Sequence, residues 1–474
     1  MAEVSTKKAA MINAGGKYSK VLLSVIVNAI LARILSADDY GIVAVITVFS
    51  TLFTTLSDMG FGTAIIQRKD LRKDEIDDIY SFTVYLSLFL TIVFCLCAYP
   101  IAIFYENKAY IPLGLLLSIS LFFNALNMVP NGILNREKKF VSIAVRTVAV
   151  YVVSSIITVI LAYCGLRYYA LIFQAIISAF LQFGWNFITT RPKFHFRFNM
   201  GSVKKIFSYS GFQFAFNLVN YFSRNLDNLL TGKYVGNTEL GFYNKAYTLM
   251  LYPVNNLAGV VSPVLHPILS DYQDQKEIIY QKHMKIVRLF LCIGLYVSLL
   301  CYLGAEEVVN ILYGSNWQES VICFQYLSLA IATQMVNSSA GAVYQAIGNT
   351  RLLFLNSCIN TVITVVAICI GVFWGESIAI LSICVSIAYI FHFLTAFFML
   401  VRFGFQYSLL RFVKEISSEI IVLLVLVAAV IVYPFQVNQI FLSFLLKAVY
   451  LSIPFVITLL LTKEIRLFKW LLKK

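Results

Sequence analysis

Long runs of apolar residues fill this chain from end to end, and only short polar connectors separate them. Each run is close to the ~20 residues that an α-helix needs to cross the hydrocarbon core of a bilayer. The runs are continuous, whereas the strands of a membrane β-barrel would alternate apolar and polar positions. The pattern therefore predicts an all-α polytopic membrane protein. The fourteen predicted spans are 13–35, 41–66, 79–104, 110–134, 142–164, 168–190, 206–231, 239–265, 284–312, 319–347, 352–374, 376–401, 413–433 and 440–462.

The composition agrees with this pattern. Apolar residues make up 60% of the 474 residues and charged residues only 13%, with a mean hydropathy of +0.81. Soluble domains carry nearer ~25% charged residues. The nine cysteines all fall within the predicted spans or at their ends, so we expect them to be packing residues.

Basic residues are distributed unequally between the two sides of the predicted membrane. Of the 37 Lys and Arg residues, 28 lie on the side of the two termini, and the other side holds only Lys108, Arg167 and Lys233. By the positive-inside rule, both termini are cytoplasmic. Topology and contact with anionic lipid then explain the net charge of +14, which in a soluble protein would suggest nucleic-acid binding.

Residues 28–41 and 228–241 resemble each other at an offset of 200, and each stretch links the first two spans of one half. Because six spans separate the copies, the repeat is parallel. It predicts two six-helix bundles, 1–200 and 201–402, around a central cavity, with two additional helices and a basic cytoplasmic tail in 403–474. Two such bundles suit a transporter that works by alternating access.

The seventh span is the richest in polar residues. A charge at the centre of a bilayer costs ~2.5–3.5 kcal/mol on insertion scales, so such residues usually face a cavity or a partner. One interpretation is a cavity wall in which Arg224 meets an anion and Asp227 tunes it or carries an ion. The alternative is a structural ion pair between these two residues, which lie three apart on the helix. The predicted wall consists of Asn217, Asn220, Arg224, Asn225, Asp227 and Asn228.

Three charged residues in the first half are further candidates. Lys20 and Arg146 lie near the cytoplasmic ends of their spans, where they could bind a phosphate group of a ligand or extend to the interface. Asp58 lies inside the second span and could join an ion site or pair with a basic residue. Pro253 and Pro263 interrupt the eighth span, which suits either a moving gate or a static kink.

The sequence shows no P-loop, no paired histidines at metal-ligand spacing and no long connector that could fold as a catalytic domain. We therefore expect no enzyme activity, no cofactor and no metal. A Na⁺ or H⁺ gradient remains a possible energy source, with Asp58 and Asp227 as coupling candidates.

Four stretches resemble known motifs in order and spacing: 57–68, 134–140, 223–233 and 240–246. They are similar to the second helix, the loop after the fourth helix, and the seventh and eighth helices of Wzx-type polysaccharide flippases. These proteins belong to the multidrug/oligosaccharidyl-lipid/polysaccharide (MOP) exporter superfamily.

The resemblance implies a flippase that moves undecaprenyl-diphosphate-linked oligosaccharides across the bacterial inner membrane, for O-antigen, capsule or exopolysaccharide synthesis. It implies a lipid-linked oligosaccharide, membrane lipids, and polymerases and glycosyltransferases of the same pathway as partners. Lys20, Arg146 and Arg224 would meet the diphosphate or acidic sugars. The first span lacks the further arginines that related peptidoglycan-precursor flippases carry, and the last two spans exceed the twelve of the basic fold.

Two other functions remain open. A drug or cation antiporter of the same superfamily would prefer an acidic cavity, whereas this chain carries more basic than acidic residues in its spans. A membrane-embedded enzyme of polysaccharide synthesis would need a larger extramembrane loop.

Overall fold

The computed structural model describes residues 6–58, 61–68, 70–258, 265, 269–273, 275–435 and 437–467. The chain forms two compact units, Met1–Gly241 and Phe242–Lys474. They differ in their bounds from the predicted bundles because α9 packs on α2 and α4 of the first unit. The predicted division into two six-helix bundles and an appendage stays a prediction.

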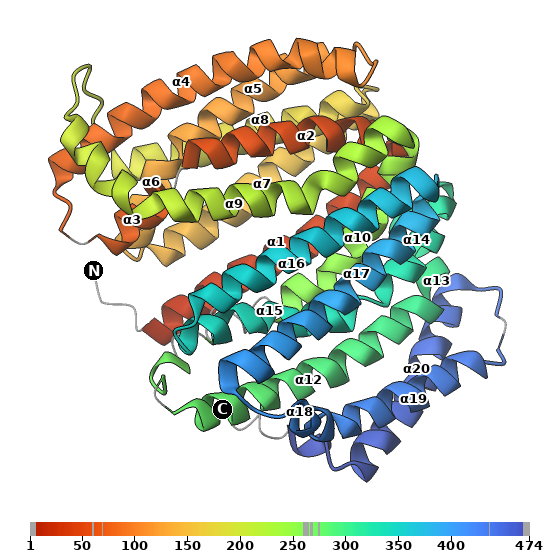
Figure 1. Cartoon of the computed structure of the whole chain (residues 1–474). Helices are drawn as coiled ribbons and strands as arrows, with labels where there is room; N and C mark the ends of the chain where they lie inside the picture. Colours follow the sequence, from red (N-terminus) through yellow and green to blue (C-terminus); the bar gives the residue numbers. More distant parts are fainter. Residues whose placement is uncertain are drawn as a thin grey trace. The chain divides into compact units, whose positions relative to one another are not determined.

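The first unit contains nine helices and the beginning of a tenth within its described residues (Figure 1). Their bounds are α1 Thr6–Ile34, α2 Ala37–Asp58, α3 Phe61–Gln67, α4 Lys73–Phe104, α5 Tyr110–Leu126, α6 Met128–Arg136, α7 Phe140–Tyr163, α8 Tyr168–Thr190, α9 Met200–Tyr234 and α10 Asn237–Pro253.

The second unit takes up the rest of α10 and the helices that follow it. Their bounds are η1 Val254–Ala258, α12 Lys276–Leu303, α13 Ala305–Leu312, η2 Ser315–Trp317, α14 Gln318–Ser328, α15 Ile331–Ala346, α16 Thr350–Cys369, η3 Ile370–Trp374, α17 Ile378–Met399, η4 Leu400–Phe405, α18 Leu409–Glu415, α19 Ser417–Ile431 and α20 Ile440–Leu461.

The prediction of an all-α membrane protein is confirmed, and each predicted span coincides with a helix or a broken helix. In the described part, nine helices are long and apolar enough to cross a membrane. A tenth span is made by α14 and α15 if that pair, bent by 54°, crosses as one. The number of fourteen spans stays a prediction, because several spans are broken or short. The second predicted span, for example, is divided between α2 and α3.

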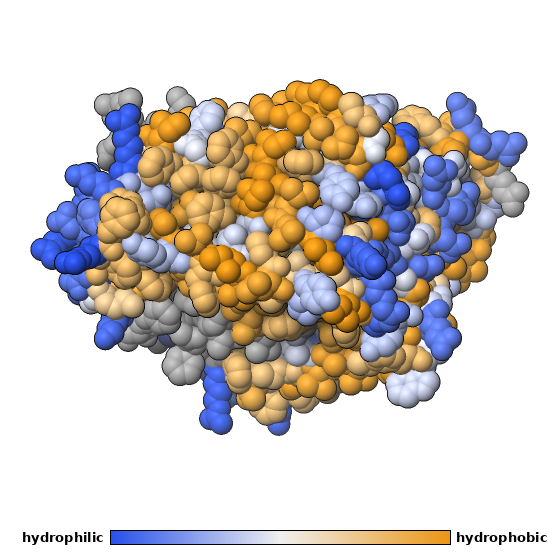
Figure 2. Space-filling view, turned by 90° about the horizontal axis from the view of Figure 1, so that it is seen from above, coloured by the Kyte–Doolittle hydropathy of each residue, from blue (hydrophilic) through white to orange (hydrophobic). Residues whose placement is uncertain are grey.

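Helix α5 is the centre of the first unit and packs against α2, α4 and α8. Its buried face follows the helical period through Tyr110, Leu113, Leu117 and Leu121. Opposite faces of many helices carry large exposed apolar side chains, and Figure 2 shows apolar residues over much of one face of the molecule. Such surface suits contact with lipid rather than water.

The two copies of the sequence repeat meet each other within the first unit. An added Cβ on Gly41 of α2 would lie 1.7 Å from the backbone oxygen of Asn237, at the start of α10. An added Cβ on Gly241 of α10 would lie 1.9 Å from the backbone oxygen of Ala37, at the start of α2. Gly41 and Gly241 are 200 residues apart, and so are Ala37 and Asn237, the residues that they contact. The contact is therefore reciprocal between the two copies of the repeat. Only glycine permits this close approach of the two helices.

In the second unit, α12 packs against α14, α15, α19 and α20. The last two helices lie beside α12 (Figure 1). They are joined to it by a buried cluster formed by Cys292, Leu299, Val422, Leu426, Leu451 and Leu459. These helices are therefore an integral part of the second unit.

Replacement of Gly41 or Gly241 by Ala is expected to lower the thermal stability of the detergent-solubilised protein. The added methyl group meets backbone rather than a movable side chain, and overpacking of this kind costs about 1–3 kcal/mol or more. Gly184→Ala in α8 is the matched control, because its Cβ would meet nothing within 4 Å. Equal melting temperatures for all three variants would contradict the close contact.

Candidate functional site

Four asparagines line one face of the broken helix α5–α6. Asn124, Asn127, Asn131 and Asn135 follow one another at intervals of three, four and four residues. This spacing places them in a row along one side of a helix. Amide groups in a membrane helix need partners that lipid cannot supply, so such a row indicates a cavity or a polar neighbour.

The row faces a cavity of about 330 Å³ inside the first unit. This volume lies in the range of ~300–1,000 Å³ that is typical of small-molecule sites. The wall comes from α2, α3, α5 and α6. It is formed by Thr54, Asp58, Gly62, Ile66, Asn124, Asn127, Met128, Asn131, Gly132 and Asn135.

Helix α3 is held against α6 by a close approach of glycines. An added Cβ on Gly132 would lie 3.4 Å from the backbone oxygen of Gly62. Phe61 and Ile65 of α3 are fully buried in the neighbouring core, whereas Gly62 and Ile66 line the cavity. The seven residues of α3 thus present one face to the core and another to the cavity.

Arg146 of α7 lies behind the asparagine row and is only 5% exposed. Its Nη1 donates hydrogen bonds to Oδ1 of Asn131 at 3.2 Å and to Oδ1 of Asn186 in α8 at 2.5 Å. Nδ2 of Asn186 in turn donates to Oδ1 of Asn127 at 2.7 Å. The guanidinium therefore fixes the orientation of two amides in the cavity wall.

No carboxylate of the described residues lies within ion-pair distance of Arg146, and its Nε has no hydrogen-bond partner. A buried guanidinium without a counter-charge creates a positive potential in a medium of low dielectric constant. It favours an anion in the adjacent cavity. Asp58, at the end of α2, adds one carboxylate to the cavity wall.

The cavity wall predicted for the seventh span stays a prediction, because part of it lies outside the described residues. Arg224 is exposed, whereas Asp227 is buried and accepts a hydrogen bond from the backbone N–H of Asn228. Nδ2 of Asn225 donates to the carbonyl of Tyr221 within the same helix. The side chains of Asn217 and Asn220 lie outside the described residues. None of the described residues of this set lines the 330 Å³ cavity.

The other predicted residues have different surroundings. Lys20 is exposed on α1, with its Nζ 5.8 Å from the centroid of the Tyr151 ring. Pro253 is the last residue of α10, and the π-helical turn η1 follows it directly. Pro263 lies outside the described residues. Lys20 and Arg146, both proposed to meet a phosphate, thus differ sharply in burial, and the roles of Lys20 and Pro253 stay predictions.

The asparagine row is the feature that sequence reasoning missed. Its signal was present as a helical period of one polar residue type within an apolar run. The row crosses from α5 into α6 at Asn127, and hydropathy alone does not distinguish uncharged amides within an apolar run.

A family model described as polysaccharide biosynthesis protein matches residues 30–322, which is more than half of the chain. The chain belongs to this family. It is similar to the lipopolysaccharide biosynthesis protein WzxC of Escherichia coli strain K12, with 25% identity over 372 residues. The matched part covers 75% of this chain and 74% of WzxC.

Solved transporters share the fold of this family member. The lipid II flippase MurJ, in an inward closed conformation, matches with a TM-score of 0.75 at 16% identity, covering 96% of this chain and 99% of that one. An inward-facing multidrug resistance MATE family transporter of the MOP superfamily matches with a TM-score of 0.60 at 16% identity. That match covers 80% of this chain and 93% of the transporter. The predicted relation to polysaccharide biosynthesis proteins is confirmed by the family model, and these two transporters show that the fold is shared.

Replacement of Asn186 by Leu is expected to destabilise the first unit by about 1–3 kcal/mol, because it leaves Arg146 with one partner fewer and Asn127 without its donor. Thermal unfolding in detergent measures this loss. Gln182→Leu on the same helix is the control, since Gln182 bonds only locally to Ser178. Similar melting temperatures for both variants would show that the network contributes little.

Proposed function

We propose that this chain is a flippase that moves undecaprenyl-diphosphate-linked oligosaccharides from the cytoplasmic to the outer leaflet of a bacterial inner membrane. The observation that carries the proposal is the amide-lined cavity backed by the buried Arg146, which has no ion-pair partner among the described residues. Membership of the polysaccharide biosynthesis protein family and the fold of a lipid II flippase support it.

The chemistry of the cavity suits a glycolipid headgroup. Asparagine amides both donate and accept hydrogen bonds, as sugar hydroxyls require. Arg146 lies directly behind Asn131, which lines the cavity and accepts a hydrogen bond from it. The positive charge of Arg146 therefore favours a diphosphate or an acidic sugar in the cavity. A headgroup held in this way would cross the membrane as the protein alternates between open sides.

The proposal includes an orientation and a pathway. The basic connectors favour cytoplasmic termini. Repeat units that reach the outer leaflet would then be available to a polymerase for O-antigen, capsule or exopolysaccharide synthesis. A Na⁺ or H⁺ gradient would drive the exchange, with Asp58 in the cavity wall and buried Asp227 as ion-binding candidates.

The test is the leaflet accessibility of a labelled undecaprenyl-diphosphate oligosaccharide in vesicles with and without the protein. We expect protein-dependent transfer, and a loss of roughly 5- to 150-fold in rate for the double variant Asn124→Leu/Asn135→Leu. Two lost hydrogen bonds of ~0.5–1.5 kcal/mol each give this range. This pair leaves the Arg146 network intact. Gln182→Leu should transfer at the wild-type rate, and an unchanged rate in the double variant would remove the asparagine row from the site.

Export of organic cations is a second candidate function, because Asp58 places a carboxylate in the cavity wall. Two results together would favour it: the protein transports a fluorescent cation and loses this transport in Asp58→Asn, and it transfers no glycolipid. Transfer of glycolipid without cation transport would exclude it.

A further inference from the structure

The last two helices are fastened to α12 and α13 by polar contacts at both ends. At one end, Nζ of Lys447 donates to Oε1 of Glu307 and to the carbonyl of Leu303, in a buried pair with one charge of each sign. Midway, the hydroxyl groups of Tyr296 and Ser452 are 2.8 Å apart. The other end contains a different cluster, in which the charges do not balance.

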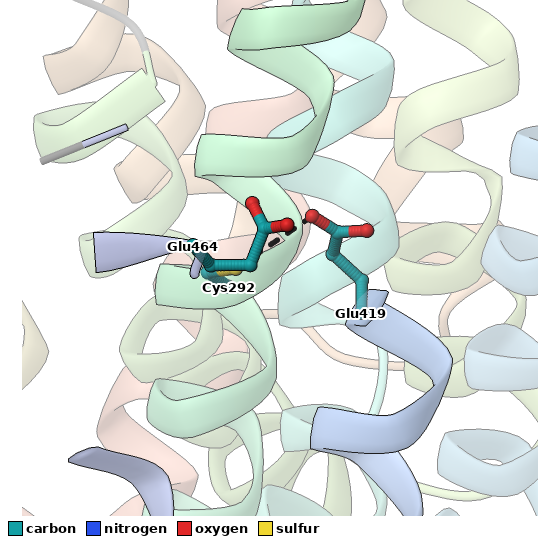
Figure 3. A group of neighbouring side chains, drawn as sticks. All are labelled: Cys292, Glu419 and Glu464. Atoms are coloured by element: carbon teal, nitrogen blue, oxygen red, sulfur yellow. Dashed lines mark hydrogen bonds between the residues drawn. The ribbon is translucent and has the colours of Figure 1, made fainter. Parts of the chain in front are cut away.

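This cluster contains Arg288 and Cys292 of α12, Glu419 of α19 and Glu464 in the turn after α20. Figure 3 shows Glu419 and Glu464 converging beside Cys292. Nε of Arg288 donates to Oε1 of Glu419 at 3.1 Å, and its Nη2 donates to Oε1 of Glu464. Sγ of Cys292 lies 3.9 Å from Oε1 of Glu419, as a weak donor. Glu419 is 1% exposed and Glu464 is 2% exposed.

Two carboxylates and one guanidinium leave one negative charge in excess if both carboxylates are ionised. The second oxygen, Oε2, of each carboxylate is buried and has no hydrogen-bond partner. Glu307 at the opposite end also has one such oxygen, but Lys447 balances its charge. An uncompensated buried charge is expensive, and a protein removes it by taking up a counter-charge.

We propose that Glu419 and Glu464 together hold one exchangeable proton. Two carboxylates that share a site cannot both ionise readily, so one proton is retained between them. A resident Ca²⁺ or Mg²⁺ fits less well, because such a cation takes six or more oxygen ligands and water would have to supply most of them here. Arg288 already takes one oxygen of each carboxylate, which leaves two oxygens and a thiol.

Arg411 of α18, near this end, bonds to Glu415 and to Glu277 at the start of α12. Among the described residues, the groups that contact the two carboxylates are the guanidinium of Arg288 and the thiol of Cys292. Loss of the proton would place a net negative charge between α12 and the end of α20. Proton occupancy thus sets how tightly the last two helices are held, whatever substrate the cavity takes.

Infrared difference spectroscopy of the full-length protein in detergent tests the site through the stretching band of a protonated carboxylic acid. We expect such a band at neutral pH that disappears as the pH is raised, and that is absent from both Glu419→Gln and Glu464→Gln. Glu307→Gln, at the opposite end, should retain it. Persistence of the band in both cluster variants would overturn the proposal. Its displacement by Na⁺ at constant pH, with binding of radioactive sodium, would overturn it in favour of a sodium site.

Thermal stability gives an independent readout that differs between the contacts at the two ends of α20. Because the folded state binds a proton that the unfolded state releases, the wild-type melting temperature should fall as the pH rises through the range of proton loss. Glu464→Gln leaves one carboxylate with one guanidinium, so its melting temperature should be maintained and should depend less on pH. Glu307→Gln leaves Lys447 unpaired and should melt at a lower temperature. A lower melting temperature for Glu464→Gln with an unchanged pH dependence would contradict the shared proton.

Discussion

The hydrogen bonds that Arg146 donates to Asn131 and Asn186 organise the polar interior of the first unit. The hydrocarbon core of a bilayer offers no partner to a guanidinium, so a buried charge such as that of Arg146 is satisfied inside the protein. The amides of Asn131 on α6 and Asn186 on α8 accept hydrogen bonds from Arg146. A third amide, that of Asn127, is oriented by its hydrogen bond from Asn186. The cavity wall is thus fixed by a charge that does not itself line the cavity, which gives an apolar fold a defined polar surface at one place.

The same requirement organises the second unit, although the solution differs. Its buried carboxylates are met by basic side chains of neighbouring helices, Glu307 by Lys447 and Glu419 by Arg288. These contacts fasten the last two helices to the unit at both ends, and the apolar cluster around Leu426 fills the space between them. One end has balanced charges and the other does not, so the two ends respond differently to pH.

Hydropathy was sufficient to predict the helices, because the length and apolar character of a membrane helix are set by the bilayer. It does not predict contacts such as that of Gly132 with Gly62, which join residues far apart in the sequence. The offset repeat was readable, and the reciprocal contact of Gly41 and Gly241 gives it a physical meaning. Domain bounds drawn from that repeat remain predictions.

The site was harder to predict than the fold. Counting polar residues favours the seventh span, which stays a prediction, whereas the cavity described in the first unit is lined by another set of amides. Arg146 and Asp58 stand out as single charges in an apolar sequence, whereas the asparagines of α5 and α6 carry no charge and are spread over two helices. Whether an amide faces a cavity or its own helix, as Asn225 does, depends on side-chain packing that the sequence does not record.

Photo-cross-linking from a benzophenone amino acid in place of Ile66, which lines the cavity, tests most directly that this cavity receives the headgroup. With a glycolipid labelled in its sugar, we expect cross-linking at this position that excess unlabelled glycolipid abolishes. Cross-linking from position 224 on α9, with none from position 66, would contradict the account and return the site to the seventh span.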